Sequence, residues 1–181
     1  MIEPKVKGNF FERVLQFVKK KLGPKGLEEM GVTPGDHNID QWYPYSEFCE
    51  ILRSSQDLFP DLHPTTIFKI GHFTMARDER WQTMFKGQEP KDIFSTNKRQ
   101  DALFMVGRFL VEKVEDNMVQ VRMTLWSNEE EHNHLWAEYY WGVMSGVLDL
   151  SGTEGEVTMD VDDEGDRKAW VYRVLWGDPQ E

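Results

Sequence analysis

The sequence predicts an α+β domain in which N-terminal helices pack against a four-stranded antiparallel sheet. Three observations support this class. Hydrophobic residues recur at helical spacing through the first half, they alternate along two hairpin-like segments in the second half, and one long helical segment separates those hairpins. We expect a single domain over residues 1–181, with a mainly helical part at 1–102 and a hairpin–helix–hairpin part at 103–181.

Helical spacing in the first half predicts an opening helix, a second helix, a helix or helix pair, and one further helix. These segments are residues 8–26, 43–59, 63–85 and 89–104. In the first, Asn9 is a candidate cap with Glu12 three residues later, and Gly23 ends the helix. In the second, Pro44 fits the first turn, where a missing N–H costs nothing.

The second half changes to strand-like alternation and back. The predicted elements are a hairpin at residues 107–126, a helix at 128–150 and a second hairpin at 156–176. Ser127 or Asn128 is the expected cap of the helix. Residues 129–131 are all glutamate and fall in its first turn, where the helix dipole favours negative charge.

Composition argues against several functions. The net charge of −11 and the pI near 4.9 argue against a nucleic-acid partner, because phosphate binding needs a basic surface. No segment approaches the roughly 18–20 apolar residues that cross a bilayer, so we expect no membrane span. Cys49 is the only cysteine, which leaves no intramolecular disulfide and favours a reducing, cytoplasmic compartment.

Aromatic and methionine side chains are abundant. The chain has 7 Trp, 11 Phe, 5 Tyr and 9 Met, more than a minimal core needs, and this excess indicates an apolar cavity or a dimer surface. The candidates for lining a cavity between the helical half and the sheet are Phe73, Met75, Trp136, Tyr140 and Met144. Core packing explains the same residues equally well.

The histidines form no metal-binding pattern. His132 and His134 are two residues apart, which places them about 200° apart around a helix and prevents chelation of one ion. His134 and Glu138 suit an exposed hydrogen bond. His72, in an apolar helical context, is either a core histidine with a satisfied ring or an axial ligand if haem binds. We expect no metal site.

No catalytic motif is present, so we expect a non-enzymatic protein. The sequence contains no nucleophile elbow, Walker loop or dinucleotide-binding glycine pattern. The acidic segment at residues 160–166 lacks the spacing of an EF-hand, and a solvated turn is favoured over a calcium site. Gly142 and Gly146 lie four apart on one helix face, where they allow a close approach to the sheet or to a second subunit.

The order of these segments resembles a superfamily. It joins haem nitric-oxide-binding (H-NOX) domains, 4-vinyl-reductase-type ligand-binding domains and the ligand-binding-fold subunits of the TRAPP tethering complex. The resemblance lies in "GNFFERVLQFVKKKLG", "WYPYSEFCEIL", "VEKVEDNMVQVRMTLWSNEEEHNHLWAEYYWGVMSG" and "WVYRVLW", which follow the opening helix, the second segment, the hairpin with its helix, and the closing strand of H-NOX domains. It implies an H-NOX-like fold over most of the chain.

The same resemblance gives an expectation about haem. H-NOX domains hold the haem propionates with a Tyr-x-Ser-x-Arg motif after this hairpin, and Leu125, Ser127 and Glu129 stand at the matching positions here. A glutamate in place of the arginine repels a propionate. No histidine matches the family's iron ligand. We therefore expect no cofactor, with haem bound through His72 as the alternative.

The sequence thus favours a sensor or adaptor module that binds a hydrophobic small molecule and signals through a homodimer or a signalling protein. Two alternatives remain. One is an interaction or scaffold subunit without a ligand, as the TRAPP resemblance implies, and the other is a gas sensor that holds haem or another tetrapyrrole.

Overall fold

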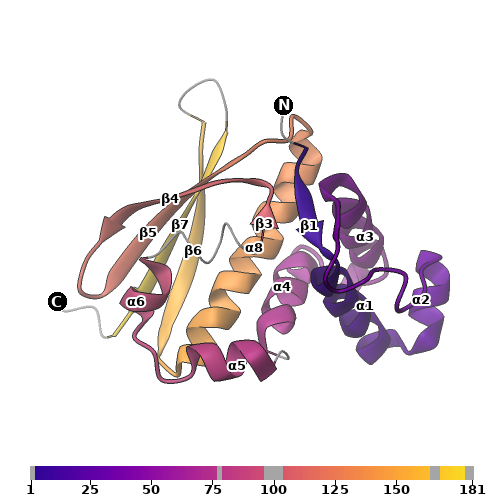
Figure 1. Cartoon of the computed structure of the whole chain (residues 1–181), viewed down its shortest axis with the longest axis horizontal. Coiled ribbons are helices and arrows are strands. Elements are labelled where there is room, and N and C mark those ends of the chain that lie inside the picture. Colours follow the sequence, from indigo (N-terminus) through magenta and orange to yellow (C-terminus); the bar gives the residue numbers. More distant parts are fainter. Residues whose placement is uncertain (1–2, 77–78, 96–103, 164–167, 178–181) are drawn as a thin grey trace.

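Two groups of elements lie side by side in the computed structural model, which describes residues 3–76, 79–95, 104–163 and 168–177 (Figure 1). The first group is mainly helical, and the second contains the large sheet and the longest helix. The helical group consists of α1 (Gly8–Leu22), α2 (Pro24–Met30), α3 (Tyr45–Asp57), the short 3-10 helix η1 (Pro60–Leu62) and α4 (Thr66–Ala76).

The large sheet has four antiparallel strands, as predicted, and their order is β4-β5-β7-β6. Its strands are β4 (Gly107–Val114), β5 (Met118–Leu125), β6 (Gly155–Asp162) and β7 (Ala169–Trp176). The inward residues of β5 are Val119, Val121, Met123 and Leu125, all of which are buried as the alternation predicted. On the edge strand β6, the alternation predicts that Val157 and Val161 are buried. Val157 is buried, whereas Val161 is 43% exposed.

The protein also has a second, small sheet, which the sequence did not predict. Strand β1 (Lys5–Lys7) pairs antiparallel with β2 (Trp42–Pro44) on one side and with β3 (Phe104–Met105) on the other. These strands have only two or three residues, too few to show a period of two. The small sheet connects the start of the chain to both groups of elements.

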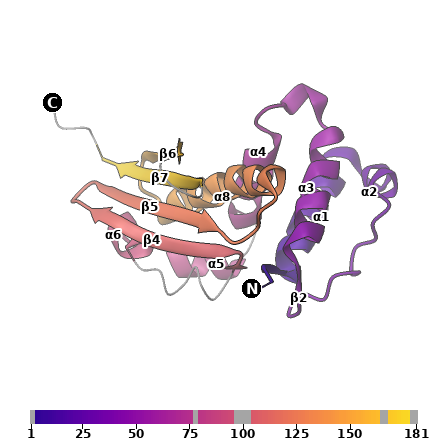
Figure 2. The ribbon, with the colours of Figure 1, turned by 90° about the horizontal axis from the view of Figure 1, so that it is seen from above.

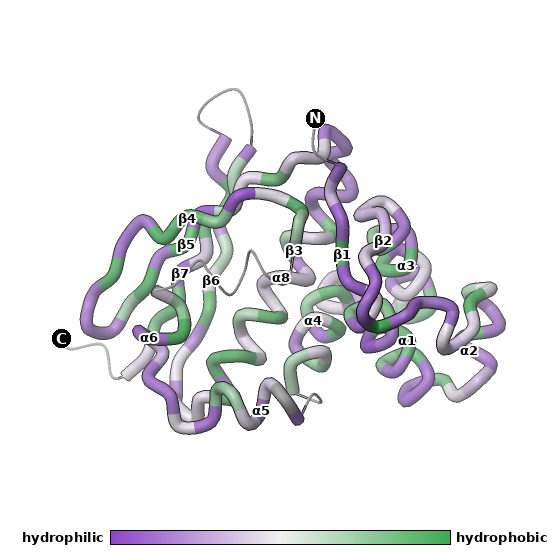
Figure 3. Tube along the Cα trace, viewed as in Figure 1, coloured by the Kyte–Doolittle hydropathy of each residue, from purple (hydrophilic) through white to green (hydrophobic). Residues whose placement is uncertain are grey.

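Helix α8 (Glu130–Ser151) is the centre of the molecule. Figure 2 shows α8 and α4 between the large sheet and the pair α1 and α3. Fourteen of the 22 residues of α8 are buried, so it packs on more than one face. Figure 3 shows hydrophobic segments along both α4 and α8, which agrees with this position between two layers.

Helices α4 and α8 pack backbone against backbone. A Cβ atom on Gly71 of α4 would lie 2.0 Å from the carbonyl oxygen of Tyr139, and one on Gly142 of α8 would lie 2.0 Å from that of Phe68. A Cβ on Gly146 would lie 2.9 Å from the carbonyl oxygen of His72. The two glycines of α8 therefore bring it close to α4, and not to the sheet as the sequence suggested.

The predicted segments of the first half differ from the structure in detail. Residues 63–85 form a pair of helices, α4 and α5 (Glu79–Phe85). The segment at 89–104 begins as α6 (Pro90–Phe94), and its residues 96–103 lie outside the described part of the chain. Helix α2, which directly follows Gly23, was missed.

Both predicted helix caps are wrong. Helix α1 begins at Gly8 with Lys7 at the cap position and no side-chain hydrogen bond there, so Asn9 with Glu12 forms no capping box. The cap position of α8 is occupied by Glu129. Ser127 still contributes, because its hydroxyl oxygen accepts the backbone N–H of Glu129 at 3.1 Å. Within the described residues, no helix combines the length and the apolar character of a transmembrane segment.

Candidate functional site

A pocket of about 360 Å³ lies where the helical group meets the turn between β5 and α8. We call it the junction pocket. Its lining consists of Glu3, Pro4, Pro44, Tyr45 and Ser46 from the chain start and the β2–α3 connection, and of Trp126, Ser127, Asn128, Glu129 and His132 from the β5–α8 turn. The volume lies at the lower end of the range of small-molecule sites.

Backbone hydrogen bonds fix the turn that forms one wall of this pocket. The N–H of Trp126 donates to the carbonyl oxygen of Val106 at 2.9 Å, which continues the sheet pairing beyond β5. The side-chain amide of Asn133 donates to the carbonyl oxygen of Ser127 at 3.0 Å. The turn is therefore held from the sheet on one side and from the first turn of α8 on the other.

His132 lies between two carboxylates at the contact of α3 and α8. Its Nε2 is 3.1 Å from Glu50 of α3, and its Nδ1 is 2.7 Å from Glu129. The imidazole is buried, whereas both carboxylates are more than half exposed. Arg53 continues the network by contacting Glu131 at 2.8 Å. These contacts join the two halves of the molecule beside the junction pocket.

This network around His132 was not predicted from the sequence. The three glutamates were expected in the first turn of the helix, where its dipole favours negative charge, and His132 was considered only as a possible metal partner of His134. Glu50 is 82 residues away from His132 in the chain, so no local spacing could have revealed the contact. His132 is buried, whereas His134, two residues further along α8, is exposed.

Tyr45 and Cys49 approach the same turn of α8 from α3. The Tyr45 hydroxyl donates to the carbonyl oxygen of His132 at 2.9 Å, and burial raises the pKa of Tyr45 well above its usual value. Burial also raises the pKa of the Cys49 thiol, whose Sγ is 3.5 Å from the same carbonyl oxygen. Cys49 therefore stays a neutral thiol and is a poor nucleophile.

A second pocket of about 230 Å³ lies on the other side of Ser127 and Asn128. Lys168 and Trp170, at the start of β7, contribute to its lining. Lys168 forms a hydrogen bond with Glu130 and thereby lowers the pKa of that carboxyl group. A cation, Lys168, therefore lies beside the β5–α8 turn, where H-NOX domains have their Tyr-x-Ser-x-Arg motif. Lys168 is 39 residues beyond Glu129 in the chain, so an alignment of the motif alone does not reveal it.

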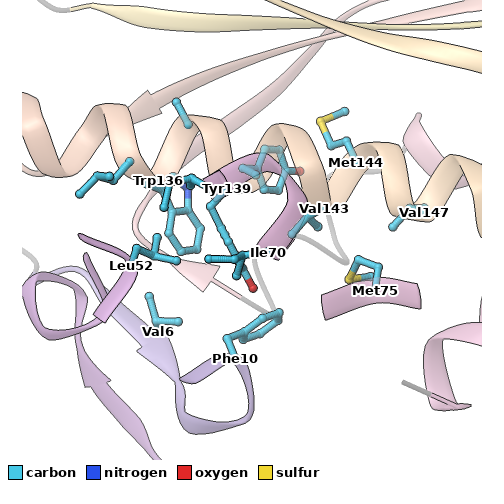
Figure 4. Close-up of a cluster of buried hydrophobic side chains, with 14 of the residues drawn as sticks. Val6, Phe10, Leu52, Ile70, Met75, Trp136, Tyr139, Val143, Met144 and Val147 are labelled. Carbon is cyan, nitrogen blue, oxygen red and sulfur yellow. The ribbon is translucent and has the colours of Figure 1, made fainter. Parts of the chain in front are cut away.

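The five predicted pocket residues lie in four different places. Trp136 packs against α3, with its ring 5.7 Å from that of Phe48, whereas Tyr140 faces the sheet, with its ring 5.1 Å from that of Phe109. In Figure 4, Met144 lies on the sheet side of α8, and Met75, which belongs to α4, lies on the opposite side.

Trp136, Tyr140, Met75 and Met144 are each at most 2% exposed and belong to the core. Phe73 is half-buried and lines a groove on the outer side of α4. The structure does not bring the five residues together, and their role in ligand binding stays a prediction.

His72 lies near the same outer side of α4. Its Nε2 is 2.7 Å from a carboxylate oxygen of Asp149, a residue near the end of α8, and its side chain is 34% exposed. The imidazole therefore lines the outer groove and does not face the space between α8 and the sheet. Its role as an axial ligand stays a prediction.

Solved structures of H-NOX proteins share this fold. An Fe(II) unliganded H-NOX protein from K. algicida is 13% identical, covers 97% of this chain and 99% of its own, and superposes with a TM-score of 0.69. A structure described as probing haem distortion in the H-NOX family is 12% identical, with 97% of both chains covered and a TM-score of 0.65. An oxygen-binding H-NOX domain related to soluble guanylate cyclases is 12% identical, with 96% of both chains covered and a TM-score of 0.65.

The chain therefore has the H-NOX fold, as the sequence resemblance implied. Neither a protein-family model nor a curated protein matches the sequence. Identities of 12–13% establish the fold and leave the ligand to be inferred from the residues of this chain.

Our prediction of no cofactor is wrong in the light of these structures. They are described as Fe(II), haem and oxygen-binding proteins, and they superpose on nearly the whole chain. The prediction rested on Glu129 replacing an arginine in one short motif and on the lack of a histidine that matches the family's iron ligand, and it took no account of cations supplied by other segments. Lys168 is such a cation. Haem is therefore the cofactor to be tested.

Proposed function

We propose that this chain is a non-enzymatic sensor module that binds a hydrophobic small molecule in the junction pocket and transmits the bound state to a partner. One observation carries the proposal: both halves of the molecule line this pocket, with Pro44 and Tyr45 on one side and Trp126 and His132 on the other. A ligand there would contact both halves and would shift the equilibrium between their packed arrangements.

The lining suits an apolar body with one polar end. Pro4, Pro44 and Trp126 offer apolar surfaces, and the hydroxyl of Ser127 can donate or accept a hydrogen bond. The hydroxyl of Tyr45 stays neutral because burial raises its pKa, so this residue of the lining offers a hydrogen-bonding group and no charge.

Haem fits the residues around this turn in part. Ser127 offers a hydroxyl to a propionate, and Lys168 offers an ammonium group that it shares with Glu130, whereas the charges of Glu129 and Glu130 oppose a propionate. His132 is the histidine of the junction pocket, and it would bind iron only by giving up a contact with Glu50 or Glu129. When bound, haem supplies an iron atom that can take a diatomic gas.

Native mass spectrometry of the freshly purified protein tests the proposal, followed by titration with hemin under reducing conditions. We expect a noncovalent adduct of discrete mass, or a Soret band that saturates at one hemin per chain. Trp126→Ala should weaken the binding at least about tenfold, because a large apolar contact is lost. A preparation that carries no adduct and binds no hemin would contradict the proposal.

Trp42→Ala is the matched control. Trp42 in β2 is half-buried like Trp126, and it is not part of the lining of the junction pocket. If both variants lose binding equally, the loss reflects general destabilisation and the pocket assignment fails. A cytoplasmic location, together with signalling through a second copy or another protein, belongs to the same proposal.

A further inference from the structure

A groove of about 370 Å³ runs between the end of α1 and the outer face of α4, apart from the junction pocket. Its apolar surface comes from Phe17, Leu62 and Phe73. The rings of Phe17 and Phe73 are 5.4 Å apart and nearly perpendicular, so they form a corner of two aromatic surfaces. Phe17 is buried, and Leu62 and Phe73 are half-buried.

Three lysines line the same groove: Lys20, Lys21 and Lys69. The Nζ of Lys20 lies 5.5 Å from the centre of the Phe73 ring, and the Nζ of Lys21 lies 6.0 Å from that of Phe17. Cation–π attraction favours these positions. The ammonium groups are thus held beside the apolar surface.

The chain has 32 acidic and 21 basic residues. Within the described ranges, none of these three exposed lysines forms an ion pair with a carboxylate, whereas Lys5, Lys25, Lys91, Lys113 and Lys168 do. What distinguishes Lys20, Lys21 and Lys69 is that they gather around one apolar groove. The carboxylate of Asp149, which contacts the groove residue His72, is already hydrogen-bonded to that imidazole.

From this geometry we propose that the groove binds an alkyl carboxylate, a fatty-acid-like anion of medium chain length. The alkyl chain lies against Phe17, Leu62 and Phe73, and the carboxylate meets the ammonium groups of Lys20 and Lys69. The volume is near the lower limit of small-molecule sites, which favours a chain of medium length. A neutral chain would leave the three positive charges without a partner, and a cation would be repelled.

Isothermal titration calorimetry with dodecanoate, below its micelle concentration, tests this proposal on the full chain. We expect one dodecanoate per chain, with dodecanol bound at least about tenfold more weakly and dodecyltrimethylammonium not bound. Equal affinities for dodecanoate and dodecanol would overturn it, as would a lack of dodecanoate binding. Displacement of dodecanoate by equimolar hemin would assign the groove to a tetrapyrrole dicarboxylate instead.

Charge reversal locates the binding. Lys20→Glu with Lys69→Glu should weaken dodecanoate binding at least about tenfold, and the matched control Lys91→Glu with Lys113→Glu, which changes the net charge equally, should leave it within about twofold. The variant with Lys20→Gln and Lys69→Gln should lose an intermediate amount of dodecanoate affinity. It replaces the charge-reversal variant in the test if that variant does not fold. Equal losses in the test and control pairs would overturn the proposal. Hemin binding at the junction pocket should be unchanged in all three variants.

Discussion

Gly71 of α4 and Gly142 of α8 each face the backbone of the other helix, where a Cβ atom would come within 2.0 Å of a carbonyl oxygen. Real side chains do not tolerate such a distance, so only glycine permits this helix pair. The sequence shows the glycines, whereas the partner of each is known only from the fold.

Gly142→Ala should destabilise the protein by at least about 2 kcal/mol. The overlap with Phe68 outweighs the gain of about 1 kcal/mol that alanine gives a helix interior. Urea unfolding measures the change, with Ser145→Ala on the same helix as the control. A Gly142→Ala variant as stable as the control would show that α4 and α8 are farther apart than described.

His132→Ala should cost about 1–2 kcal/mol of unfolding free energy, because Glu50 and Glu129 lose their shared partner and a buried ring is removed. His134→Ala, two residues along the same helix, should change it by less than about 0.5 kcal/mol, since His134 is exposed. Thermal unfolding of the two variants side by side checks the difference. Equal effects would contradict the described placement of the two rings.

Tyr45→Phe should lower the unfolding free energy by about 1 kcal/mol. The variant keeps the ring and removes the buried hydroxyl, which donates to the carbonyl oxygen of His132 and lies 3.2 Å from Oδ1 of Asn133. Tyr43→Phe is the control, because the hydroxyl of Tyr43 accepts a more exposed backbone N–H from Asn38. If Tyr43→Phe lowers the unfolding free energy as much as Tyr45→Phe does, the buried hydroxyl contributes no more to stability than the exposed one.

Glu112→Gln should reveal a pH-dependent contribution to stability. Burial acts to raise the pKa of Glu112, and hydrogen bonds from Arg122 and Gln120 outweigh it, so the folded pKa is lowered. A lowered folded pKa means that the stabilisation is fully present above the unfolded pKa of about 4.3 and is lost as the pH falls through the folded value.

The wild-type advantage over Glu112→Gln should therefore be constant above about pH 5 and shrink below about pH 4, with a size of up to about 1 kcal/mol for this partly exposed pair. Urea unfolding across this pH range measures it. Replacing Arg122 by methionine should remove most of the pH dependence and leave the smaller part due to Gln120, and an undiminished pH dependence in that variant would show that another group causes it.

Much of the fold followed from local patterns. The period of two in β5 predicted four buried residues correctly, and the helical spacing of residues 128–150 predicted α8. The small sheet could not be predicted this way, because β1, β2 and β3 pair across the whole chain and are too short to show a period.

The candidate site was less predictable. The sequence identified the β5–α8 turn as the position of a cofactor motif, and it named Ser127 and Glu129 there. It did not identify the neighbours of that turn, because Glu50 and Lys168 come from distant segments. The same limit explains the error on the cofactor, since one aligned residue does not give the charge around a site.

The sequence by itself determined the secondary structure of the second half, the apolar faces of its elements and the resemblance to H-NOX domains, because these depend on the spacing of neighbouring residues. Tertiary structure alone decided which side of α8 meets α4, which carboxylates reach His132 and which lysines collect in the outer groove. The decisive contacts among these, such as Gly142 with Phe68 and His132 with Glu50, join residues tens of positions apart, and their energies arise only when folding brings the side chains together.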